Sequence, residues 1–194
     1  TTPADGAFYS HQIEQSVRFD DGSSSYLSRT HSGTATNEDV GLISFWFKRG
    51  NNIGSTTNEA IAGGDGSSGL RIEFNTGNPA GFSDAVTMTI NGSTGSAAGH
   101  TTSRRFRDPS GWTNFIIEYN SDDSTTADRF KWYINGVIYP DFTNGSGTGT
   151  GATDFWRQNG TTHIASALDF AFTKNGGTTN FGRSPANSGS YYDG

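Results

Sequence analysis

The sequence has 194 residues, a formal net charge of −6, no cysteine, and 31% apolar residues, of which aromatic side chains form an unusually large share. The length suits one large β-sandwich, and buried aromatic rings can supply the core that scarce aliphatic residues would not. These features exclude disulfides and thiolate metal sites, and the lack of a basic stripe argues against nucleic acid as a partner.

The domain organisation follows from composition. Residues 1–12 are expected to form an N-terminal arm, followed by a single domain at 13–194. No apolar run has the length that crosses a membrane, and the first residues do not resemble a signal peptide. Because the first residue is Thr1, we expect a processed N-terminus or a longer parent polypeptide.

Alternation of apolar and polar residues, typical of β-strands, recurs along the chain, and no segment keeps a helical period. The alternating segments lie at 17–19, 42–48, 70–74, 86–90, 114–119 and 164–172. In the second of these, Ile43, Phe45 and Phe47 share one side and Trp46 lies on the other. The pattern predicts an all-β, two-sheet antiparallel sandwich.

The pair Asn135-Gly136 lies between two alternating apolar runs, which strongly predicts a β-hairpin with a type I′ turn. The turn would pair Ile134 with Val137 and Trp132 with Tyr139. Both faces of this hairpin are apolar, so we expect it to lie in a covered part of its sheet. Trp112, at the start of a predicted strand, is expected to cover the core.

Polar, glycine-rich stretches separate the predicted strands and are expected to be loops. They lie at 51–58, 63–69, 91–102, 120–127 and 143–153. Glycine occupies alternate positions of 145–151, which favours a flexible loop tip over a surface that orders only against a partner.

The carboxylates lack the pattern of a β-sandwich glycosidase, which needs two of them on one strand face. The glutamates are widely separated, although carboxylates from different strands remain an alternative. The histidines lack metal-ligand spacing, and no serine occupies a sharp turn before a helix. We therefore expect no catalytic residue and no enzymatic activity. The histidines are His11, His31, His100 and His163.

Several aspartates in or beside polar loops offer the oxygen ligands that calcium prefers. Their spacing does not match an EF-hand, and turns in which the aspartate bonds its own backbone explain them more simply. We assign no metal site and no cofactor. These aspartates are Asp65, Asp84, Asp122, Asp123 and Asp128.

Arginines at 104, 105 and 107 form the main cationic cluster. We interpret it as a solvated loop with local ion pairs, such as Arg107 with Asp108, because exposed charges in loops commonly pair with their neighbours.

Trp156 follows the glycine-rich loop and has polar neighbours. An indole ring can stack on a sugar while an arginine and an amide bind its hydroxyls, so Trp156, Arg157 and Asn159 are the candidate glycan-binding residues. A tryptophan that only stabilises its own loop is the alternative.

Six short stretches follow one another along nearly the whole chain: IEQSVRF at 13–19, SYLSRT at 25–30, ISFWFKR at 43–49, RRFRDPSGW at 104–112, DRFKWYING at 128–136 and FGRS at 181–184. Taken in this order, they resemble concanavalin A-like jelly-roll domains of the laminin-G-like type, especially those in tail and virion proteins of bacteriophages, marine ones above all. The series is more specific than any one stretch.

The resemblance implies a jelly roll in a phage fibre, tail or head appendage that adheres to host-surface glycans, assembled with other virion proteins or as a homo-oligomer. A purely architectural virion protein is the main alternative, and a polysaccharide-degrading hydrolase is less favoured. The resemblance brings no catalytic residues, and the loop-edge calcium of some relatives has no assigned position here. In relatives the equivalent of 190–194 leads into a further strand, which we expect to come from chain beyond Gly194, the 1–12 arm or a neighbouring subunit.

Overall fold

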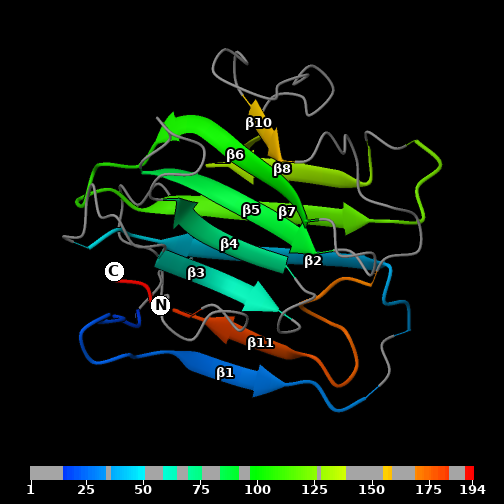
Figure 1. The fold of residues 1–194 in the computed structure, drawn as a ribbon, viewed down its shortest axis with the longest axis horizontal. Helices are drawn as coiled ribbons and strands as arrows, with labels where there is room; N and C mark the ends of the chain where they lie inside the picture. Colours follow the sequence, from blue (N-terminus) through cyan, green and yellow to red (C-terminus); the bar gives the residue numbers. More distant parts are fainter. Residues whose placement is uncertain are drawn as a thin grey trace, which may run out of the picture.

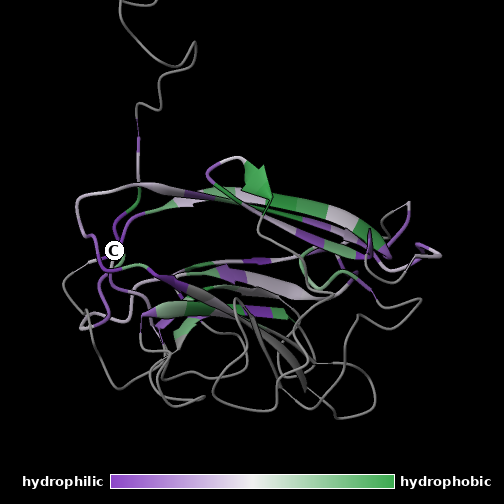
Figure 2. Cartoon of the chain, turned by 90° about the horizontal axis from the view of Figure 1, so that it is seen from above, coloured by the Kyte–Doolittle hydropathy of each residue, from purple (hydrophilic) through white to green (hydrophobic). Residues whose placement is uncertain are grey.

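The computed structural model describes residues 15–33, 36–50, 59–64, 70–75, 84–91, 97–125, 128–138, 155–158, 169–183 and 191–194. Within these ranges the regular elements are β-strands, arranged in two antiparallel sheets, one of which lies in front of the other in Figure 1. Figure 2 shows the sheets as two separate layers. The predicted two-sheet antiparallel sandwich is therefore confirmed.

The larger described sheet has seven strands in the order β1-β11-β3-β4-β5-β6-β10, and the smaller has four in the order β2-β7-β8-β9. The larger sheet contains β1 (Leu27–Thr30), β3 (Glu59–Gly64), β4 (Leu70–Asn75), β5 (Ala85–Asn91), β6 (Ala97–Arg105), β10 (Phe155–Gln158) and β11 (Thr178–Phe181). The smaller contains β2 (Val40–Phe47), β7 (Thr113–Asn120), β8 (Phe130–Ile134) and β9 (Val137–Ile138).

The core lies between the sheets and is rich in aromatic rings. As predicted, Ile43, Phe45 and Phe47 of β2 face it. The Phe47 and Phe115 rings meet edge to face at 4.7 Å, and Phe115 meets Trp132 at 5.2 Å. Rings in this arrangement gain from quadrupole contacts in addition to the large apolar area each one buries.

The predicted hairpin is confirmed in its turn but not in its burial. Asn135 and Gly136 have φ values of 53° and 77°, as a type I′ turn requires, and Ile134 pairs with Val137. Val137 and Ile138 are 68% and 52% exposed, so the expectation of a covered hairpin is wrong for β9, whereas Trp132 and Ile134 of β8 are buried. Strand β9 lies at the edge of the described sheet.

Two further expectations need correction. Trp112 does not cover the core, because half of it is exposed. Residues 97–102, expected as loop, belong to β6, and residues 155–158, for which no strand was predicted, form β10. Their small and polar residues carry no apolar alternation, so their strand conformation comes from pairing with neighbours.

The C-terminal residues lie beside the segment predicted as the first strand. Phe19 and Gly194 exchange two backbone hydrogen bonds, 2.8 and 3.2 Å long, although the segment at 17–19 is not itself a regular strand. The 1–12 arm and Tyr139 lie outside the described residues. The further strand expected beside the C-terminus stays a prediction.

Candidate functional site

Two of the predicted glycan-binding residues lie on β10. Trp156 pairs with Thr101, and Arg157 pairs with His100. The glycan-binding role of these residues stays a prediction. Asn159 lies outside the described residues.

Glu73 and its partner Thr87 lie on the face of the larger sheet opposite the core, here called the polar outer face, and they are only 4% and 3% exposed. By backbone register this row continues through Thr101 to Trp156. Leu70, Ile72 and Phe74, which alternate with Glu73 in β4, are buried in the core, which fixes the opposite orientation of Glu73.

A second row on the same face brings polar residues together from distant strands. Arg71 pairs with Gly63, and Gly63 pairs with Asn180. The residue between Arg71 and Asn180 in this row is therefore a glycine, which has no side chain. Asn180 is 4% exposed, yet its Oδ1 finds no hydrogen-bond partner among the described residues. The same holds for Nε of Arg71. Such groups are costly to bury unless water or a ligand satisfies them.

Glu73 gives this face a buried acid. The residue is 4% exposed, and burial raises the pKa of its carboxyl group although Arg71 acts in the opposite direction. A carboxyl group with a raised pKa can donate as well as accept a hydrogen bond, as can a sugar hydroxyl. Sequence analysis missed Glu73 because it occupies an ordinary polar position of an alternating strand, and its burial depends on the tertiary structure.

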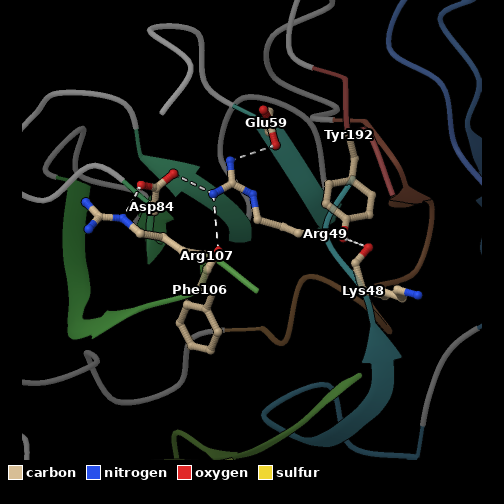
Figure 3. A network of polar contacts seen from close by, with 7 residues as sticks. All are labelled: Lys48, Arg49, Glu59, Asp84, Phe106, Arg107 and Tyr192. Atoms are coloured by element: carbon tan, nitrogen blue, oxygen red, sulfur yellow. Dashed lines mark hydrogen bonds and ion pairs between the residues drawn. The ribbon is translucent and has the colours of Figure 1, made fainter. Parts of the chain in front are cut away.

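A second group of buried charges surrounds Arg49, just beyond the end of β2 (Figure 3). Its Nη1 donates to Asp84 Oδ1 at 2.6 Å and to the Phe106 carbonyl at 3.3 Å, and its Nη2 lies 3.4 Å from Glu59 Oε2. The guanidinium group also lies over the Phe74 ring at 4.2 Å. Arg107 Nε donates to Asp84 Oδ2 at 2.8 Å.

This network joins segments from both sheets. Burial raises the pKa of Glu59 to about 7, more than Arg49 lowers it. Nearby, the buried Tyr192 hydroxyl donates to the Lys48 carbonyl at 2.5 Å. The acids in the network bind arginine, and these ion pairs link the ends of the strands.

The structure accounts for four aspartates weighed as calcium ligands. Asp84 binds Arg49 and Arg107, which also corrects the expected pairing of Arg107 with Asp108. Asp123 accepts from the Thr125 backbone, the turn geometry that was favoured. Asp122 accepts from Asn37, and Asp128 pairs with Lys131. Asp65 lies outside the described residues.

A different acidic group can offer ligands to a cation. Carboxylate oxygens of Asp20, Asp21 and Asp193 lie within 4.8 Å of one another. Hard cations such as calcium bind oxygen sets of this kind. The Asp20 Oδ1 atom also accepts from the Gly22 backbone, so a local turn explains part of the arrangement.

No protein-family model and no curated protein matches this sequence. In the described ranges, no helix is long and apolar enough to cross a membrane.

Proposed function

We propose that this chain is an outward-facing, non-catalytic domain of a bacteriophage virion, in a fibre, tail or head appendage, and that its polar outer face binds glycans of the host surface. The series of stretches resembling phage jelly-roll domains supports the virion context, and a two-sheet sandwich is the architecture that this resemblance implies.

One observation carries the glycan proposal. Arg71 and Asn180 bring polar atoms without hydrogen-bond partners in the described structure to one face of the larger sheet, in a row adjacent to that of Glu73 and Trp156. Sugar recognition needs donors and acceptors at fixed positions, commonly together with an aromatic residue. A rigid sheet supplies such positions better than loops do.

The proposal is tested in two steps. An array of bacterial surface polysaccharides should yield a ligand for the purified chain, and antibodies should locate the chain on purified particles. Failure to find the chain in purified virions would end the virion proposal. An array without any ligand would end the glycan proposal.

A purely architectural virion role is the second candidate, favoured by the outward face of the smaller sheet. Leu42, Trp46 and Ile138 are 60%, 43% and 52% exposed there, and large exposed apolar residues on one face commonly mark protein contacts. On this alternative, Leu42→Lys should reduce incorporation into particles, whereas Asn180→Ala should not. The glycan proposal predicts that Leu42→Lys leaves sugar binding unchanged.

A further inference from the structure

Three side chains from separate parts of the chain meet at the β1 edge of the larger sheet, at the bottom of Figure 1. Tyr26 immediately precedes β1, Arg183 follows β11, and Tyr191 forms an isolated β-bridge with Arg183. Between β11 and Arg183, Gly182 has a φ of +83°, and a Cβ there would lie 2.4 Å from the Phe19 ring. Glycine at this position therefore permits the backbone turn that leads to Arg183.

The two tyrosine rings hold the arginine head group. The Arg183 Cζ atom lies 4.7 Å from the centre of the Tyr26 ring and 5.7 Å from that of Tyr191. The ring centres are 6.3 Å apart, with an angle of 51° between their planes. Both distances are within the range of cation–π attraction, so the rings orient the guanidinium group without neutralising its charge.

No anion within the described part of the chain neutralises Arg183. Its Nε is buried without a hydrogen-bond partner there, and none of the ion pairs in these ranges includes it. Arg49 and Arg107, in contrast, both bind carboxylates. Tyr26 is 42% exposed, so a ligand can approach the cluster from solvent.

The chemistry of the cluster selects its ligand. A guanidinium group is planar and matches a carboxylate with two parallel hydrogen bonds, whereas an exposed aromatic ring offers an apolar face to the C–H groups of a sugar. The net charge of −6 and the position of Asp193 two residues after Tyr191 disfavour the binding of a densely charged polyanion. A saccharide with a single carboxylate offers the carboxylate to the guanidinium group and its C–H groups to the aromatic ring.

We infer that Tyr26, Arg183 and Tyr191 form a binding site for a carboxylate-bearing sugar, such as a uronic or sialic acid residue of a surface polysaccharide. The choice of a saccharide rests on the proposed function. The site lies beyond the Arg71–Asn180 row and uses none of its residues.

The test is calorimetric titration of the intact chain with trigalacturonic acid and with N-acetylneuraminic acid, each compared with its methyl ester. At least one acid should bind, and its ester should bind at least about tenfold more weakly, as expected for the loss of charge-assisted hydrogen bonds. Arg183→Gln should cause a loss of similar size. Arg183→Lys should recover only part of the affinity, because an ammonium group lacks the planar pair of donors.

Arg104→Gln is the matched control, because Arg104 also lies near an aromatic ring, that of Phe106 at 5.4 Å, but belongs to β6, which is not a neighbour of β1 or β11 in the sheet. It should leave the affinity unchanged, and the unfolding midpoint of each variant will confirm that it folds. Equal binding of acid and ester, or an equal loss in Arg104→Gln, would overturn the inference. So would the absence of binding by either acid.

Three further outcomes separate this inference from the proposed function. If a glutamate-rich hexapeptide binds through Arg183 and neither acidic sugar does, the site belongs to a protein partner and the sugar assignment is wrong. If the array yields only neutral glycans whose binding ignores Arg183→Gln but requires Asn180, the proposed function stands and this inference fails. Binding of trigalacturonic acid that needs Arg183 but not Asn180 supports the inference even if the polar outer face binds nothing.

Discussion

The buried carboxyl group of Glu59 should make the stability of this domain depend on pH in an unusual direction. Glu59 is 1% exposed and has only a long contact with Arg49, 3.4 Å, because Arg49 makes its 2.6 Å bond to Asp84. The other oxygen of Glu59, Oε1, is buried without a hydrogen-bond partner among the described residues. Burial raises its pKa from 4.5 to about 7.

The direction of the pH dependence follows from the number of protons that the folded and the unfolded chain bind. Between pH 4.5 and 7 the folded chain holds a proton on Glu59 that the unfolded chain releases, so this group's contribution to stability falls as the pH rises through that window. A pKa difference of this size corresponds to about 2–3 kcal/mol of unfolding free energy lost between pH 5 and pH 8. Glu59→Gln carries no titratable proton and should lack this loss.

Urea unfolding of the wild type and Glu59→Gln at pH 5, 6, 7 and 8 measures the effect. The stability of the variant relative to the wild type should increase by about 2–3 kcal/mol across the series. Glu73→Gln serves as a comparison, since burial also raises the pKa of Glu73, on the opposite face of the sheet from the core. Parallel curves for the wild type and Glu59→Gln would refute the reasoning, as would a relative loss of stability by the variant at high pH.

Three substitutions test the packing. Asn135→Pro should lower stability by about 3 kcal/mol, because proline cannot adopt the φ of 53° and cannot donate the 2.9 Å hydrogen bond to the Asn114 carbonyl. Asn135→Gly is the control, and an unchanged thermal midpoint of Asn135→Pro would contradict the turn assignment. Trp132→Ala should cost about 3–5 kcal/mol in chemical unfolding, since Trp132 is wholly buried in the core, and a cost under 1 kcal/mol would contradict that position. Gly182→Ala should lower the thermal midpoint, because its Cβ would meet the Phe19 ring, and a midpoint equal to the wild type would argue against the turn before Arg183.

The parts of the fold that sequence predicts are those where successive residues of a strand alternate between the core and the opposite, more exposed face. Strands β2 and β8 show this alternation in their exposure, and the Asn135-Gly136 turn has a local conformational cause. Strand β3 is buried throughout and ends in two glycines, so its residues carry no alternation. Its strand conformation comes from pairing with β4 and β11, which sequence spacing alone does not reveal.

The candidate sites were less predictable for the same reason. Composition around Trp156 favours a sugar, but the pairing of this strand with β6 cannot be read from the sequence. Asn180 and Arg71 share a row only because β3 lies between their strands. Local patterns identify residue types suited to a ligand, whereas the tertiary arrangement decides which of them lie together.

The central claim is that the polar outer face binds a glycan, and the affinity of Asn180→Ala for the strongest array ligand tests it most directly. The Oδ1 atom of Asn180 has no hydrogen-bond partner within the described structure, so its removal should leave the unfolding midpoint nearly unchanged. If Asn180 binds the sugar, the affinity should fall about tenfold, as expected for a lost hydrogen bond in a fixed site. The control Leu42→Ser, on the opposite outer face, should bind like the wild type. Unchanged affinity of a folded Asn180→Ala variant would contradict the claim.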